Sequence, residues 1–99
     1  MRVISRTKLK EFYETKGYED AKIALERWYH IAVHAEWKNW SEIKVDFPLT
    51  DYVGNQHYVF NIKGNNYRLV VVIKFTISKI FVRFVGIHKE YDKIDCSTI

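Results

Sequence analysis

The feature that most constrains the fold is a change in hydrophobic period near residue 57. Beyond this point, three runs of residues are rich in Val, Ile, Phe and Tyr and are separated by turn-forming residues, a pattern typical of adjacent β-strands. The runs cover residues 58–63, 66–75 and 79–87. Strands joined by connections this short pair in the antiparallel direction. The C-terminal half of the chain is therefore predicted to form an antiparallel sheet.

Gly64 and Asn65 predict the register of the first two strands. A two-residue type II′ turn has glycine at its first position, where φ is positive. Such a turn places Asn61 opposite Arg68 and puts both on one face of the sheet, together with Lys63. The other face is apolar and consists of Tyr58, Phe60, Ile62, Tyr67, Leu69, Val71 and Ile73.

A second turn is predicted around Ile77 and Ser78. In that register Val72 pairs with Arg83, and Arg83 lies on the same face as Arg68. The predicted sheet therefore has one apolar face for packing and one basic, partly apolar face that stays open.

The N-terminal half is predicted to contain one short strand, residues 1–4, and two helices. The first helix begins near Ser5 or Thr7, either of which can cap it, and ends at Gly17. The second covers about residues 19–36, and its apolar stripe consists of Ala21, Leu25, Trp28, Ala32 and Ala35. Ser41 begins a short helical turn that Pro48 ends.

No repeat or linker interrupts the sequence, so residues 1–99 are expected to form a single domain. Its class is α+β, with two N-terminal helices packed on one face of an antiparallel sheet of three to four strands.

Positive charge is concentrated in the predicted sheet. The chain has a net charge of +4, and no Asp or Glu occurs from residue 52 to residue 89. The same segment contains Lys63, Arg68, Lys74, Lys79, Arg83 and Lys89. A surface whose charges are all positive is destabilised by their mutual repulsion unless a polyanion binds to it. This favours a phosphate backbone as the partner. The alternative is that these are lysines and arginines on a solvated sheet face.

Several function classes are disfavoured. Cys96 is the only cysteine, so no disulfide forms within the chain, and the longest apolar run, residues 69–73, is too short to span a bilayer. The N-terminus lacks the apolar stretch of a signal peptide, so we expect a cytoplasmic protein without membrane contact. His30 and His34 have metal-ligand spacing, but no glutamate follows His30 and no third ligand is evident. We therefore expect neither a metal nor a cofactor.

Two stretches of the sheet region together resemble a known family. They are the segment Phe-Asn-Ile-Lys-Gly-Asn-Asn-Tyr-Arg-Leu-Val-Val-Val-Ile at 60–73 and the segment Phe-Val-Arg-Phe-Val-Gly-Ile-His-Lys-Glu-Tyr-Asp-Lys-Ile at 81–94. Upstream, Ala-Glu-Trp-Lys at 35–38 and Asp-Tyr-Val-Gly-Asn at 51–55 also fit. Over nearly its whole length the chain resembles the HigB branch of the RelE-like toxins, which implies the RelE-like fold.

The resemblance implies a ribosome-dependent endoribonuclease that cleaves mRNA in the ribosomal A site. In such enzymes the 2′-hydroxyl of the RNA attacks the adjacent phosphate without a metal, and the toxin is held inactive by a cognate antitoxin. In the HigB family that antitoxin is a HigA-like helix-turn-helix protein. The expected partners are thus the antitoxin, the ribosome and mRNA.

The residues needed for this chemistry are present. Arg68 and Arg83 suit the non-bridging phosphate oxygens, because a guanidinium donates forked, charge-assisted hydrogen bonds. His88 is the candidate for proton transfer, Tyr91 can stack on a base or orient the scissile nucleotide, and Asp92 can accept a proton or orient His88. The candidate RNA-binding residues are Asn61, Lys63, Lys74 and His57.

Two other functions fit the same residues. One is a non-catalytic RNA-binding module whose basic face tracks phosphate. The other is an inactive subunit that only binds the antitoxin.

Overall fold

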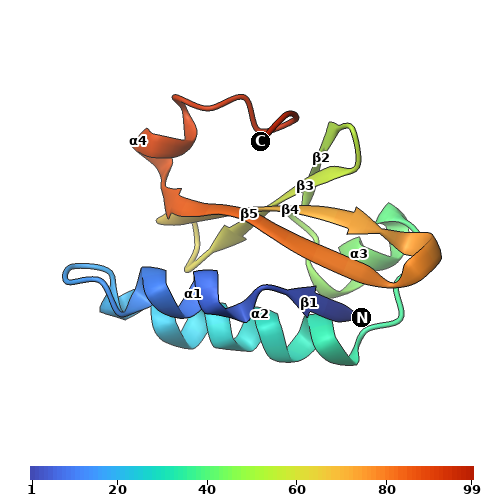
Figure 1. The fold of residues 1–99 in the computed structure, drawn as a ribbon, viewed down its shortest axis with the longest axis horizontal. Helices are drawn as coiled ribbons and strands as arrows, with labels where there is room; N and C mark the ends of the chain where they lie inside the picture. Colours follow the sequence, from blue (N-terminus) through green and yellow to red (C-terminus); the bar gives the residue numbers. More distant parts are fainter.

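The computed structural model describes residues 1–99 and is of the predicted α+β class (Figure 1). The helices are α1 (Arg6–Tyr13), α2 (Lys22–His34), α3 (Trp40–Asp46) and α4 (His88–Tyr91). The strands are β1 (Arg2–Ile4), β2 (Asp51–Gly54), β3 (His57–Ile62), β4 (Tyr67–Lys74) and β5 (Lys79–Ile87). Single 3₁₀ turns, η1 (Glu19–Ala21) and η2 (Phe75–Ile77), precede α2 and β5. No helix is both long enough and apolar enough to cross a membrane.

The sheet has five strands in the order β1-β5-β4-β3-β2, and it is mixed. β1 runs parallel to β5, whereas the other pairs are antiparallel. The prediction of three to four antiparallel strands was therefore wrong in strand number and in the direction of β1. Parallel pairing is possible because most of the chain lies between β1 and β5, which provides the long crossover that such a pair requires.

β2 is the strand that the sequence pattern did not reveal. Its four residues lie at the edge of the sheet, where they are exposed or half-buried, so they show no apolar alternation. It pairs with β3 through Asp51 opposite Val59 and Tyr52 opposite Tyr58.

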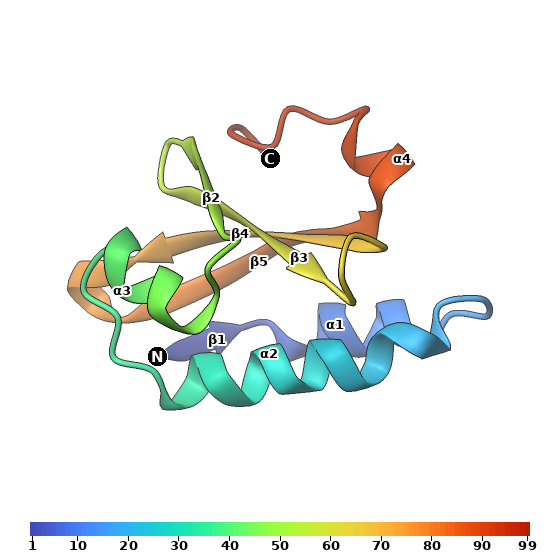
Figure 2. The same ribbon diagram turned by 180° about the vertical axis from the view of Figure 1, so that it is seen from behind.

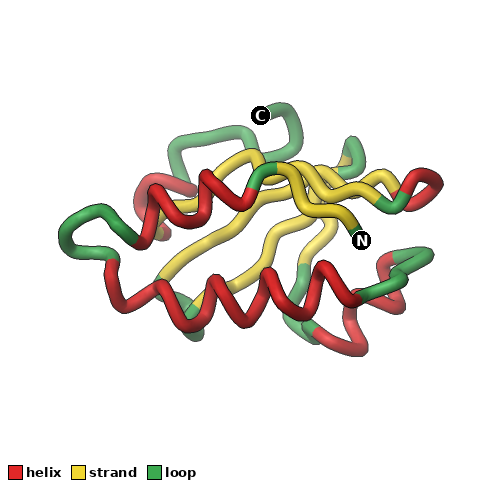
Figure 3. The backbone as a smooth tube through the Cα atoms, turned by 60° about the horizontal axis from the view of Figure 1, so that its bottom comes forward, coloured by secondary structure: helices red, strands yellow, loops and turns green.

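The two N-terminal helices cover one face of the sheet, as predicted, and α3 lies at one end of the molecule (Figures 2 and 3). The predicted stripe of α2 is the buried one: Leu25, Trp28 and Ala32 all enter the core. The ring of Trp28 meets that of Phe60 edge to face, with centroids 5.4 Å apart. Burial of this stripe against the apolar sheet face removes both surfaces from water and so stabilises the fold.

Both N-terminal helices are shorter than predicted, and α2 covers Lys22–His34 instead of about residues 19–36. Ser5 caps α1, because the Thr7 backbone N–H donates to the Ser5 Oγ at 3.2 Å. The helix ends at Tyr13, not at Gly17, and Gly17 instead takes a positive φ of 99° in the following turn.

The register of the first hairpin is confirmed, since Asn61 pairs with Arg68. Gly64 has a φ of 65°, as the turn requires. The predicted position of Lys63 was wrong. Its own φ is 51°, which takes it out of the strand, and its Nζ lies 2.6 Å from the Oδ2 of Asp20 in η1, just before α2.

The register predicted for the second hairpin was also wrong. Val72 pairs with Phe81 and not with Arg83, because η2 lengthens the connection. Further along, Val70 pairs with Phe84 and Val71 with Val82. The residue left between these pairs, Arg83, is the extra residue of a β-bulge.

The second face of the sheet is not fully open. Val59, Val70 and Val72 point to this face and are buried outside the main core cluster. The segment after α4 crosses this face on the side opposite α1 and α2 (Figure 1). The prediction of an open basic face therefore holds only at the α4 end of the sheet.

Candidate active site

Four of the five predicted catalytic residues lie where β5 passes into α4. The end of β5 lies beside the start of β4, with Ile87 opposite Tyr67 and Gly86 opposite Arg68. α4 follows β5 directly and carries His88 and Tyr91, with Asp92 at its C-cap. The pairing of β4 with β5 thus brings Arg68 next to α4, which begins 20 residues later in the sequence.

Tyr91 lies between the arginine and the imidazole. The Arg68 Cζ is 5.9 Å from the centroid of the Tyr91 ring. The centroids of the His88 and Tyr91 rings are 6.2 Å apart, with the planes at 82°. The His88 Nδ1 lies 3.1 Å from the Asp92 Oδ2. Arg68, Tyr91, His88 and Asp92 therefore form one continuous cluster, here called the α4 cluster.

Arg68 is anchored but keeps donors for a ligand. Its Nη1 donates to the backbone oxygens of Asn65 and Tyr67, at 3.1 and 3.4 Å. The side chain forms no ion pair with any carboxylate of the chain. A guanidinium has five N–H donors, so the remaining ones are available to an anion such as phosphate.

Gly86 and Glu90 support the α4 cluster, although the sequence analysis did not single them out. A Cβ at position 86 would lie 2.6 Å from the tip of the Phe84 ring and 3.0 Å from the Glu90 Oε1. The Ile87 backbone N–H donates to the same Glu90 oxygen at 3.4 Å, which fixes the first turn of α4. The sequence signal that could have identified Gly86 is its place inside a predicted strand. A glycine there often marks a point where another group approaches the backbone closely.

Tyr91 is unsuited to proton transfer near neutral pH. Burial and a hydrogen bond with Cys96, in which the hydroxyl oxygen lies 3.5 Å from the Sγ, raise the pKa of Tyr91 to about 12. The side chain therefore stays a neutral phenol. Its chemistry is that of a ring that stacks and a hydroxyl that donates.

Arg83 lies apart from the α4 cluster. The bulge leaves its side chain exposed, and its Cζ is 6.0 Å from the centroid of the Phe81 ring. It lines a shallow hollow of about 420 Å³ together with Lys8 and Glu11 of α1. No hydrogen bond, ion pair or ring contact joins it to the other four residues.

The four candidate RNA-binding residues do not form one surface. Asn61 is half-buried beside Arg68. Lys74 donates to the Gln56 side chain. His57 is only 4% exposed, and its Nδ1 and Nε2 lie 2.7 and 2.9 Å from the backbone oxygens of Asn55 and Ile99.

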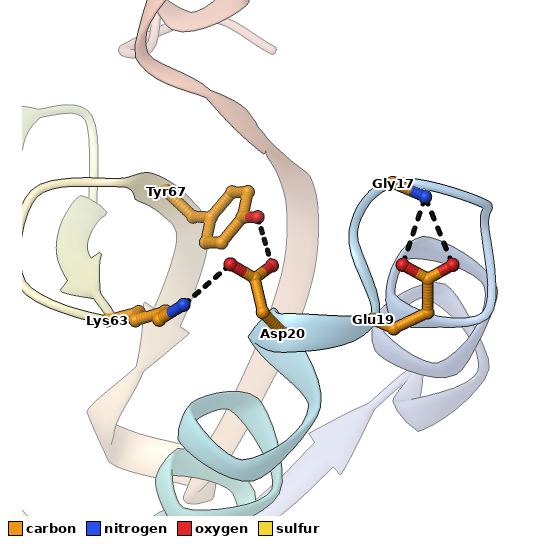
Figure 4. A network of polar contacts seen from close by, with 5 residues as sticks. All are labelled: Gly17, Glu19, Asp20, Lys63 and Tyr67. Atoms are coloured by element: carbon orange, nitrogen blue, oxygen red, sulfur yellow. Dashed lines mark hydrogen bonds and ion pairs between the residues drawn. The ribbon is translucent and has the colours of Figure 1, made fainter.

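Lys63 is held by Asp20 in η1, the turn that precedes α2. Asp20 takes hydrogen bonds from the Lys63 Nζ and from the Tyr67 hydroxyl (Figure 4). These two contacts lower the pKa of Asp20 below its ordinary value. The bond to Asp20 is also the main reason why the pKa of Tyr67 is raised to about 12. Of the predicted RNA-binding set, only Asn61 therefore adjoins the α4 cluster. No three His, Cys, Asp or Glu side chains are grouped so that they could hold a metal ion.

Comparison with known proteins identifies the family. Residues 21–94 match the family model HigB toxin, described as the RelE-like toxic component of a toxin–antitoxin system. The chain is 34% identical over 95 residues to the mRNA interferase HigB of Shigella flexneri, covering 93% of this chain and 88% of the relative. It is 29% identical over 96 residues to the mRNA interferase HigB of Escherichia coli O6:H1, covering 95% and 91%. The chain therefore belongs to the HigB toxin family, the RelE-like toxic components of toxin–antitoxin systems.

Proposed function

We propose that this protein is an endoribonuclease that cleaves mRNA on the ribosome and so stops translation. The relatives are named as mRNA interferases, and the cluster at α4 contains the groups that such a cleavage needs. The observation that carries the proposal is the His88–Asp92 pair, 3.1 Å apart, next to an arginine that has no carboxylate partner.

The reaction assigned to the α4 cluster is internal transesterification. The 2′-oxygen of a nucleotide attacks its own 3′-phosphorus, and the bond to the 5′-oxygen of the next nucleotide breaks. A 2′,3′-cyclic phosphate and a free 5′-hydroxyl result. One proton leaves the 2′-hydroxyl and one reaches the 5′-oxygen, so the step is balanced without a metal or an external reagent.

Each residue of the α4 cluster has a part in this step. Arg68 stabilises the charge that builds up on the phosphate oxygens. His88 transfers a proton, since imidazole is the side chain suited to do so near neutral pH. Asp92 holds the imidazole ring in place through Nδ1, which leaves Nε2 toward the substrate. Tyr91 packs against the base or sugar of the reacting nucleotide.

Ribosome dependence follows from how little of the substrate this surface can hold. The His88 and Asp92 side chains are 53% and 60% exposed, and Arg83 is not in contact with the cluster. An exposed site of this kind does not by itself hold flexible RNA with the attacking and leaving oxygens in line. Ribosomal RNA that fixes the mRNA in the A site would supply that positioning, which can contribute several orders of magnitude in rate.

Arg83 and Asn61 have binding roles in this proposal. Asn61 contacts the nucleotide bound beside Arg68. Arg83 contacts a phosphate at a distance from the scissile one, in messenger or ribosomal RNA. The protein acts in the cytoplasm, where the ribosomes are, and is neutralised by an antitoxin of the HigA type.

Single-turnover cleavage of end-labelled mRNA on programmed ribosomes, compared with the same RNA free in solution, tests the proposal. We expect rapid cuts in the A-site codon, very little cleavage of free RNA, and products with 2′,3′-cyclic phosphate ends. Equal cleavage of free RNA would contradict ribosome dependence. Binding to programmed ribosomes without cut products would instead favour the non-catalytic RNA-binding module.

A further inference from the structure

A second hollow surface lies between α2, the end of α3 and the β3–β4 hairpin. It contains a cavity of about 550 Å³, and a neighbouring cavity of about 240 Å³ lies under residues 48–50. Both cavities are lined by Phe47, Asn61 and Gly64, so they form one groove. None of the α4 cluster residues lines it. It is called here the β3-edge groove.

The groove runs along a strand edge that has no partner. β2 pairs with β3 only as far as Asp51 opposite Val59, so residues 60–62 have no strand on that side. The chain before β2 turns away, because the Thr50 backbone N–H donates to the Phe47 oxygen at 3.1 Å. A free strand edge is a template for main-chain hydrogen bonds, which an extended segment satisfies and a helix does not.

The walls of the groove favour an apolar occupant that also brings one hydrogen-bond acceptor. Ile23 is 84% exposed on the rim of the larger cavity, and Leu49 is 71% exposed on the smaller one. Trp28 lines the larger cavity, and its buried Nε1–H has no acceptor within the chain. Buried donors are nearly always paired in folded proteins, so this one points to an acceptor that a bound partner supplies.

The charges around the larger cavity leave one cation free. Asp20 is engaged by Lys63 and Tyr67, and Asp46 accepts from the Trp37 Nε1 at 2.8 Å. Arg27 is exposed and has no carboxylate partner. An occupant that carries a carboxylate beside its apolar residues matches this rim.

From these observations we infer that the β3-edge groove docks an extended, apolar segment of the antitoxin, paired as an added strand along residues 60–62. Its apolar side chains fill the two cavities, a main-chain carbonyl accepts from the Trp28 Nε1, and an acidic residue pairs with Arg27. The inference goes beyond the proposed function and does not depend on it, because membership of a toxin–antitoxin family is enough to require an antitoxin.

The test is calorimetric titration of the purified toxin variants with the antitoxin. Ile23→Asp is expected to weaken binding by about tenfold or more, since it places a charge where an apolar side chain docks. Ile77→Asp is the matched control, because Ile77 is also an exposed isoleucine (55%) but lies in η2, away from the groove. It should bind as the unmodified protein does. Trp28→Phe keeps an aromatic ring but loses the Nε1 donor and part of the buried indole, and it should weaken binding less than Ile23→Asp.

A second measurement is independent of substitution. Amide hydrogen exchange at Asn61 should slow markedly when the antitoxin is bound, because N–H groups of β3 alternate in direction and that of Asn61 faces the free edge while those of Phe60 and Ile62 face β4. Unchanged exchange at this amide, together with unchanged binding of Ile23→Asp, would overturn the inference. The inference would also be overturned if the free toxin formed a dimer that Ile23→Asp dissociates. The groove would then be filled by a second copy of this chain. Cleavage by Ile23→Asp should stay normal, so a failure here is distinct from a failure of the proposed function.

Discussion

The imidazole of His88 and the carboxylate of Asp92 lie one helical turn apart on α4, with Nδ1 and Oδ2 separated by 3.1 Å. Both side chains are more than half exposed, so the pair adds little to stability. Its value is geometric, since a carboxylate that holds one ring nitrogen fixes the direction of the other. The pair therefore defines where on α4 proton transfer is expected.

His88→Ala is predicted to reduce cleavage on programmed ribosomes by about a hundredfold to ten-thousandfold, the range for a general acid or base. Binding to the ribosome should hardly change, because the part of His88 is proton transfer and its side chain holds no other residue except Asp92 by a hydrogen bond. His88→Gln should not restore the rate, since an amide forms hydrogen bonds but does not shuttle a proton. Single-turnover rates and separate binding measurements give both quantities.

Lys79→Ala is the control for loss of positive charge. Lys79 begins β5, at the opposite end of the strand from α4. Its replacement should at most weaken binding in a salt-dependent manner. If His88→Ala cuts at nearly the unmodified rate, His88 has no catalytic role, whatever the outcome for Lys79.

Asp92→Asn is predicted to lower the cleavage rate without abolishing it. Loss of a carboxylate that orients a catalytic histidine costs up to about ten-thousandfold in a buried triad. We expect a smaller loss here, because both side chains of the pair are more than half exposed. The asparagine side chain has nearly the same shape, so α4 should remain folded, which circular dichroism and a melting curve would verify. Cleavage by Asp92→Asn at the unmodified rate would show that Asp92 does not orient His88.

Arg68 and Arg83 are predicted to differ, although both were candidates for the same phosphate. Arg68→Ala should reduce cleavage by about a hundredfold or more, as expected for removal of a cation that stabilises the transition state. Arg83→Ala should act mainly on affinity, with a shallower salt dependence of binding and a cleavage rate at saturation close to normal. The reverse pattern would place the scissile phosphate at the bulge of β5.

The parts of the fold that local residue patterns determine were predictable. Gly64 has the positive φ that a tight hairpin needs, and this fixed the pairing of Asn61 with Arg68. The apolar stripe of α2 likewise identified the helix face that packs on the sheet. Arg68, His88, Tyr91 and Asp92 could be proposed together because the family resemblance combines Tyr-Arg-Leu in one strand with His88, Tyr91 and Asp92 after the last strand. The short helix α4 that carries His88 and Tyr91 was not predicted.

The remaining features depend on contacts between distant segments. The bulge at Arg83 arises where β4 and β5 change register, and no residue type at that point signals it. The burial of His57 depends on Ile99, which is 42 residues away in the sequence. The pairing of Lys63 with Asp20 likewise joins two elements that are far apart in the chain. Alternation within a strand predicts which face a residue occupies, but not what covers that face.

The last prediction concerns the Asp20 contact with Lys63 and Tyr67, which ties the β3–β4 hairpin to η1, the turn before α2. Because the folded state lowers the pKa of Asp20, the unfolded chain takes up the proton first as the pH falls. The contact should therefore stabilise the fold above the ordinary carboxyl value of 3.8, and its contribution should be lost as the pH falls through the lower, folded-state pKa. Tyr67 acts at the other extreme, since its pKa of about 12 means that stability is lost as the pH rises from 10 toward 12.

Asp20→Asn should remove both effects. Urea denaturation at pH 3 to 7 should show Asp20→Asn to be less stable than the unmodified protein at pH 7, with the difference shrinking toward pH 3. Asp51→Asn is the matched control, because Asp51 is exposed and forms no ion pair. It should leave the dependence of the free energy of unfolding on pH unchanged below pH 4. The clearest readout is the slope of the free energy of unfolding against pH, which reports the difference in bound protons between the folded and unfolded states. A slope below pH 4 that is identical in Asp20→Asn and the unmodified protein would show that the hairpin is held by its apolar contacts alone.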